Sequence, residues 1–170
     1  MFSDPDTVQQ HIIDTAFHAP STPTAKAEKD VNEEILEWHF HIYFFQHNEQ
    51  QKTAALHLRQ RILDLVSEGY FKVVPLQRVN FDPIGPHPIG SYEVWAPVEH
   101  FARAYSFFTL NRGELSILIH PLTTLPRIDH STRVSWLGAP FPIDLSALPL
   151  TDDSPLGQYP KLKLGYSKPK

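Results

Sequence analysis

The sequence predicts an α+β domain in which an antiparallel sheet carries its helices on one face, in the βαββαβ order of a ferredoxin-like fold. Residues 37–44, EWHFHIYF, alternate with the period of two that is typical of a strand. Residues 48–69 repeat apolar side chains at helical spacing, and further strand-like and helix-like segments follow in that order. A chain of 170 residues suits one such domain with its own core.

Turn and cap signals separate the predicted elements. The first helix is expected to begin near Asn48, a good N-cap residue, and to end just before Gly69. Pro97 is expected to open the second helix. The elements after the first helix are bounded by glycine- and proline-containing turns and are predicted at residues 71–79 (strand), 91–95 (strand), 98–109 (helix) and 114–120 (strand).

The two ends of the chain show little periodicity. Residues 1–32 contain the linker-like stretch HAPSTPTAKAEKD, so we expect an N-terminal arm there and a single domain over residues 33–170. After Pro121 the sequence predicts a proline-rich C-terminal extension that packs over the domain. Its expected anchors are its large apolar side chains, Trp136, Leu137, Phe141 and Leu145.

Strand parity predicts which side chains share a face. In the 4-1-3-2 strand order of this topology, the first strand is central and begins beside the end of the fourth. The bulky set on the first strand should pack under the helices: Trp38, Phe40, Ile42 and Phe44. The alternate set should face the other way: Glu37, His39, His41 and Tyr43. On the fourth strand, His120 should join that second face as a cross-strand neighbour of His39.

Composition excludes several classes of site and partner. The chain lacks cysteine, so a metal must be held by nitrogen and oxygen ligands. The net charge of −4 provides no basic surface for nucleic acid or membranes. No apolar run approaches the ~20 residues of a membrane helix, and the N-terminus does not resemble a secretion signal. A cytoplasmic protein is therefore expected.

Five of the ten histidines fall on or beside the predicted histidine face. His39, His41 and His120 can converge on a common point, since imidazole binds metal at ~2.0–2.1 Å. His87 lies in the stiff motif GPHP, and His130 follows Asp129, which could orient His130 or a metal ligand. Core, turn or surface histidines with no function are the alternative for each residue taken singly. An all-histidine ligand set and a set of two histidines with Glu93 both remain open.

The motifs HFHIYF, GPHP, LNRGELSILIHPLT and DHSTRVSWLG, in this order between residues 39 and 138, resemble the DOPA 4,5-dioxygenase family of fungal and bacterial proteins. The resemblance implies a non-haem Fe(II) enzyme that cleaves the catechol ring of L-DOPA with dioxygen. The resulting seco-DOPA cyclises to betalamic acid, a precursor of betalain pigments. Arg133 departs from the family pattern, because bacterial members tend to carry a second histidine there.

The resemblance and strand parity together assign roles. His39, His41 and His120 are the favoured metal ligands, with zinc as an alternative occupant in purified protein. His87 or His130 would act as the acid/base, since histidine titrates near neutral pH. Arg133 or Arg127 would bind the substrate carboxylate, and Tyr92 and Trp136 would contact the catechol ring.

Two alternatives remain. The first is a ring-cleaving dioxygenase that acts on another catechol. The second is a metal-binding protein without catalytic activity. In this case the sheet face that carries the histidines is open and pairs with a second copy to form a homodimer.

Overall fold

The structure is a computed structural model that describes residues 34–169. The prediction of an N-terminal arm over residues 1–32 lies outside these residues. The described elements are β1 (Glu37–Phe44), α2 (Glu49–Ser67), β2 (Val74–Pro75), β3 (Gly90–Pro97), α3 (Val98–Asn111), β4 (Ser116–Pro121), α4 (Pro126–Asp129), β5 (Ser135–Leu137) and three short 3₁₀ turns at Leu145–Ala147, Pro160–Leu162 and Gly165–Ser167.

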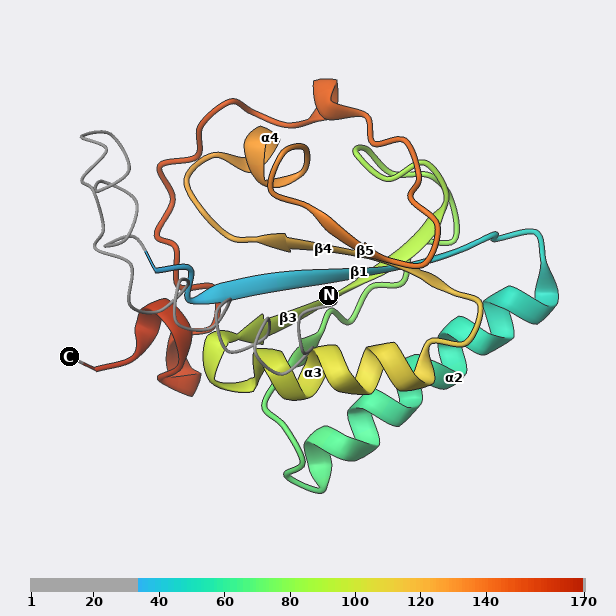
Figure 1. Cartoon of the computed structure of the whole chain (residues 1–170), viewed down its shortest axis with the longest axis horizontal. Helices are drawn as coiled ribbons and strands as arrows, with labels where there is room; N and C mark the ends of the chain where they lie inside the picture. Colours follow the sequence, from blue (N-terminus) through green and yellow to red (C-terminus); the bar gives the residue numbers. More distant parts are fainter. Residues whose placement is uncertain (1–33, 170) are drawn as a thin grey trace, which may run out of the picture. The chain divides into compact units, whose positions relative to one another are not determined.

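The strands form one five-stranded antiparallel sheet in the order β2-β3-β1-β4-β5. The α2 and α3 helices cover one face, while α4 and much of the irregular chain after β5 lie on the other (Figure 1). This confirms the α+β class with an antiparallel sheet. The four strands expected from the sequence lie in the order β4-β1-β3-β2, and β5 extends the sheet beyond β4.

β1 is central and is paired along its length with β3 and β4. Phe40, Ile42 and Phe44 are completely buried in the core beneath the helices. They pack there with the apolar faces of the two helices, which include Leu58, Ile62, Ala104 and Phe108. The prediction that the even-numbered side chains of this strand face the helices is confirmed.

Local signals define the ends of both long helices. Asn48 is the N-cap of α2, and its side chain accepts a hydrogen bond from the Gln51 N–H. Gly69 follows the helix with a φ of +76°, a left-handed conformation that glycine adopts without strain. Pro97 precedes α3, as predicted, although this helix continues two residues past 109 to Asn111. No helix among residues 34–169 is long and apolar enough to cross a membrane.

Three features differ from the sequence-based expectations. The strand predicted over residues 71–79 is reduced to Val74–Pro75, because proline has no N–H to continue a ladder. β5 has only three residues, and α4 is a single turn that begins at Pro126. Segments this short show no periodicity, so sequence patterns do not reveal them.

A buried carboxylate fixes the C-terminal segment to the sheet. Glu37 has no exposed surface. Its Oε2 accepts hydrogen bonds from Trp95 Nε1 at 2.7 Å and from the Gln158 N–H at 3.1 Å. Its Oε1 accepts one from the Tyr166 N–H at 3.1 Å. Hydrogen bonds to a charged group each contribute about 1.5–3 kcal/mol, so this cluster orders residues far apart in sequence.

Gly165→Ala tests the attachment of the C-terminal segment to Glu37, and Gly113→Ala is the matched control. A Cβ at Gly165 would lie 2.5 Å from Glu37 Cγ, whereas one at Gly113 would meet nothing within 4 Å. Both glycines have positive φ, +56° and +58°, so both substitutions carry the left-handed penalty of about 1–2 kcal/mol. Gly165→Ala should lower the free energy of unfolding by about 1–3 kcal/mol more than Gly113→Ala in urea denaturation. Equal losses would contradict the close approach.

Candidate metal centre

Three histidines meet on the sheet face opposite the long helices. His39 pairs directly with His120 across β1 and β4, and His41 follows two residues later on the same face. His39, His41 and His120 are buried, and each offers one ring nitrogen within 4.8 Å of the others. The structure therefore brings together the three side chains that strand parity predicted, and this cluster could hold a metal ion.

The backbone sets the tautomer of His120. Its Nδ1 lies 2.7 Å from the Pro121 carbonyl oxygen, which can only accept, so Nδ1 carries the proton and Nε2 has a free lone pair. This Nε2 lies 3.0 Å from His41 Nε2. Two nitrogens bound to one ion at ~2.1 Å lie about 3 Å apart when they subtend a right angle. The pair thus fits a shared ion.

His39 is oriented by a residue from the C-terminal segment. Its Nε2 lies 2.7 Å from the side-chain oxygen of Gln158 and 3.2 Å from Glu93 Oε1. A neutral His39 that donates its Nε2–H to Gln158 keeps the lone pair on Nδ1. Partners of this kind fix the ring and tautomer of metal-binding histidines.

The other two predicted histidines complete the cluster. The His130 ring centroid lies 3.8 Å from that of His120, and the His87 centroid lies 4.3 Å from that of His41. His130 donates its Nδ1–H to the Pro126 carbonyl at 2.8 Å, which leaves Nε2 as the basic nitrogen. His87 Nδ1 is hydrogen-bonded to the Tyr43 hydroxyl at 2.7 Å.

Burial keeps these imidazoles neutral. It lowers the pKa of His39 and that of His87 to about 4. Burial, reinforced by the neighbouring histidines, lowers the pKa of His41 and that of His120 well below the usual value. Because metals bind the unprotonated imidazole, the protein environment favours the form that a ligand needs.

Glu93 is a carboxylate that contacts the cluster, at 3.2 Å from His39 Nε2. It lies opposite His41 on β3, and burial raises its pKa to about 7. Its Oε1, which makes this contact with His39 Nε2, is shielded from solvent but makes no hydrogen bond with the described residues. Among the described residues, however, the group whose ligand atoms lie within 4.8 Å of one another holds the three histidines and not Glu93, so the geometry favours the all-histidine set.

Asp129 does not orient His130, although the two are adjacent in sequence. The buried Asp129 carboxylate accepts from the Thr123 N–H at 2.9 Å and from Arg133 at 3.0 Å. Its acceptor positions thus stabilise the turn that leads into α4, and the Pro126 carbonyl orients His130 instead.

Only some of the residues expected to bind substrate face the site. Arg133 is held by Asp129 and Thr123, and Arg127 donates to the Leu148 carbonyl. The Tyr92 side chain points away from the histidines, because Tyr92 lies opposite Ile42; its hydroxyl donates to the Ala55 carbonyl in the helix-side core. Trp136 does face the site, with its ring centroid 5.5 Å from that of Tyr43.

Gln158 is the site residue that sequence reasoning missed. It lies 119 positions from His39 in the chain, in a segment without periodicity. No motif or spacing identifies such a contact. The sequence predicted only that the C-terminal extension packs over the domain, without identifying this residue.

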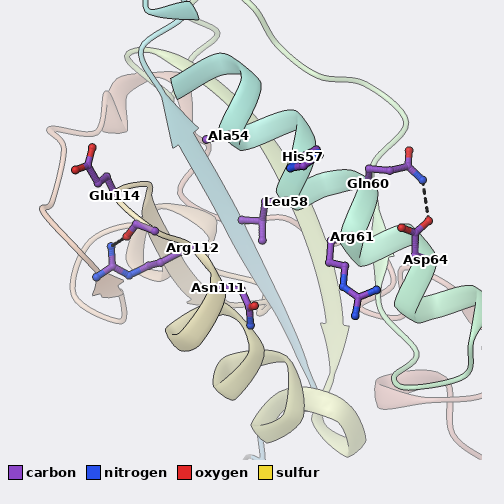
Figure 2. A pocket seen from close by; sticks show the side chains of 10 residues that line it. Ala54, His57, Leu58, Gln60, Arg61, Asp64, Asn111, Arg112 and Glu114 are labelled. Carbon is purple, nitrogen blue, oxygen red and sulfur yellow. Dashed lines mark hydrogen bonds between the residues drawn. The ribbon is translucent and has the colours of Figure 1, made fainter. Parts of the chain in front are cut away.

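A hollow of about 510 Å³ lies on the helix side of the sheet, away from the histidine cluster. Figure 2 shows side chains of α2 and of the α3–β4 turn around it, among them His57, Arg61 and Arg112. Gln60 is bonded to Asp64, and Arg112 to the Gly113 and Leu115 carbonyls. The histidine cluster, rather than this hollow, therefore has the arrangement of a reactive site.

Comparison with known proteins identifies the family of this chain. The model of the Dopa 4,5-dioxygenase family matches residues 38–147. A DOPA 4,5-dioxygenase from Amanita muscaria is 51% identical over 162 residues, which cover 92% of this chain and 71% of that protein. An uncharacterised protein from Botryotinia fuckeliana is 36% identical over 115 residues, 62% of this chain and 60% of that one.

A solved structure is also similar. The crystal structure of a dioxygenase candidate from Nostoc punctiforme superposes with a TM-score of 0.56 at 31% identity. The match covers 66% of this chain and 90% of that one.

His120→Ala tests the metal centre. Loss of partners that only orient a ligand costs 10–100-fold in metal affinity, so loss of a ligand should weaken Fe(II) binding by more than about 100-fold. Anaerobic equilibrium dialysis measures this affinity directly. His57→Ala, which removes an exposed histidine of α2, is the matched control and should bind as the wild type does. Wild-type affinity in His120→Ala would remove this residue from the ligand set.

Proposed function

The chain belongs to the Dopa 4,5-dioxygenase family, and from this premise we propose that it cleaves the catechol ring of L-DOPA with dioxygen at a non-haem Fe(II) centre. Family membership and the similar proteins make it a dioxygenase. The observation that carries the proposal is the buried cluster of His39, His41 and His120 on a single sheet face.

The donor set fits the proposed metal. The cluster offers neutral imidazoles, and a chain without cysteine offers no thiolate. Imidazole suits iron as well as zinc, and Glu93 could replace one nitrogen to give the two-histidine, one-carboxylate set of many non-haem iron oxygenases. When bound, Fe(II) would bring the catechol and dioxygen together and exchange electrons with them. The lining residues would orient the substrate and manage protons.

Two side chains are suited to proton transfer. The basic Nε2 of His130 belongs to a ring packed against His120, so this nitrogen lies beside the proposed ligands and can accept a proton from a catechol hydroxyl. His87 bonds Tyr43, whose ring packs against Trp136 and Phe141. These aromatic rings would form the apolar wall against which a catechol ring rests.

The overall reaction is balanced without another reductant. One catechol and one dioxygen give one ring-opened product that keeps both oxygen atoms, as the ring bond beside one hydroxyl-bearing carbon breaks. For L-DOPA opened at its 4,5-bond, the product is a seco-DOPA, which cyclises with loss of water to betalamic acid.

The alternative of a dimer formed through an open sheet face is less well supported. His41 is 4% and His120 1% exposed, because the chain's own segment after β4 covers this face. A second sheet therefore has no open histidine face to pair with. The element order β1-α2-β2-β3-α3-β4 supports a ferredoxin-like core, to which α4 and β5 are added on the covered side.

A direct assay tests the proposal. Metal-free protein should be loaded anaerobically with Fe(II), mixed with L-DOPA and then exposed to heavy-isotope dioxygen. We expect a yellow product that carries both labelled oxygen atoms, measured by visible absorbance and mass spectrometry. Protein without iron is the control and should give none. Failure to cleave several catechols, together with tight retention of zinc, would reject the proposal.

His130→Gln tests the proton-transfer role. General acid–base residues contribute about 10²–10⁴-fold, so kcat should fall by that factor while the iron content stays at the wild-type level. His100→Gln, on α3 and away from the cluster, is the matched control and should keep the wild-type kcat. A variant at position 130 with unchanged kcat and pH profile would show that this histidine does not move the proton.

A further inference from the structure

A small cavity adjoins the histidine cluster where β3 meets the chain that follows β2. It has a volume of about 130 Å³ and touches both His41 and His87. Ser91 and Glu93 reach it from β3, where they lie opposite Tyr43 and His41 and so share the histidine face. The remaining lining side chains include Leu76, Arg78, Asn80 and Ile84.

Three polar atoms of this cavity are buried without a hydrogen bond to the described residues, although Glu93 Oε1 contacts His39 Nε2 at 3.2 Å. Asn80 Oδ1, Ser91 Oγ and Glu93 Oε1 are shielded from solvent and make no hydrogen bond among the described residues. Such atoms are rare in folded proteins, because an unsatisfied buried group costs about 1–3 kcal/mol. All three can accept a hydrogen bond, and one of them belongs to a carboxyl group. A ligand with several N–H donors and a positive charge would satisfy them together.

A cation lies at the same cavity. Arg78 lines it and is exposed, and it forms no salt bridge with another described residue. Arg127 and Arg133, in contrast, are already engaged by the Leu148 carbonyl and by Asp129. Arg78 is therefore the better placed guanidinium for a ligand carboxylate.

We propose that this cavity binds the α-amino acid end of a catechol substrate. Arg78 pairs with the carboxylate, while Asn80, Ser91 and Glu93 accept hydrogen bonds from the ammonium group. This assignment rests on the proposed function, since it places the ring at the histidines. The volume of about 130 Å³ suits an amino acid end group rather than the whole of L-DOPA.

The cavity thus acts as a specificity site. A pocket built to pair polar groups discriminates against an analogue that lacks them, because its own buried groups then stay unpaired. Arg78, Asn80, Ser91 and Glu93 would thereby set the preference for a catechol with both an ammonium and a carboxylate over those with one charge or none.

Four catechols separate the two halves of the cavity. L-DOPA has both charged groups, dihydroxyphenylpropionate lacks the ammonium, dopamine lacks the carboxylate, and 4-methylcatechol lacks both. Arg78→Gln should lower kcat/KM about 10–100-fold for the two substrates with a carboxylate, relative to 4-methylcatechol. The double variant Asn80→Leu, Ser91→Ala should lower it by about 10-fold or more for the two with an ammonium. Arg61→Gln, on α2, is the matched control.

Binding gives a second readout that does not need turnover. Anaerobic calorimetry with zinc-loaded protein should show L-DOPA bound more tightly than 4-methylcatechol, with the difference reduced in Arg78→Gln. Equal affinity for the two ligands, or equal losses on all four substrates, would overturn the inference. Preferential L-DOPA binding without ring cleavage would instead reject the proposed function and leave this ligand site in place.

Discussion

The central constraint of this fold is that β1 is buried on both faces and paired on both edges. Its period of two sends Phe40, Ile42 and Phe44 into the helix-side core and His39 and His41 to the opposite face. A slip of one residue would exchange these sets, placing imidazoles in the apolar core and phenylalanines among the histidines. The apolar packing under the helices therefore fixes where the histidines point.

The same register extends the site across three strands. Antiparallel partners share a face, so His120 joins His39 from β4, while Glu93 and Ser91 join His41 and Tyr43 from β3. The proposed metal ligands and the proposed amino acid pocket are thus consequences of one pairing pattern. The C-terminal segment then covers this face and places Gln158 on His39, held there through the Glu37 carboxylate.

Strand parity was predictable from sequence because it depends on neighbours two residues apart. It identified the three clustered histidines, and applied to β3 it also explains Tyr92: a residue opposite Ile42 must face the helices, whatever its suitability for stacking on a catechol. Contacts made by the chain after β4 were not predictable in this way. Gln158 reaches His39 across 119 positions, and the single turn of α4 orients His130 through the Pro126 carbonyl rather than through its neighbour Asp129.

The helix-side hollow and the cavity beside the histidines show why unpaired polar atoms are a better guide to binding than volume. The helix-side hollow is about four times larger, yet its polar groups are exposed or already paired, as in the Gln60–Asp64 bond. A ligand there would exchange existing hydrogen bonds for new ones with little net gain. Beside the histidines, the fold has already desolvated Asn80 Oδ1 and Ser91 Oγ without pairing them. A ligand that donates hydrogen bonds to these acceptors offsets the cost of their desolvation. Binding is therefore expected to be strongest where buried polar atoms lack hydrogen bonds.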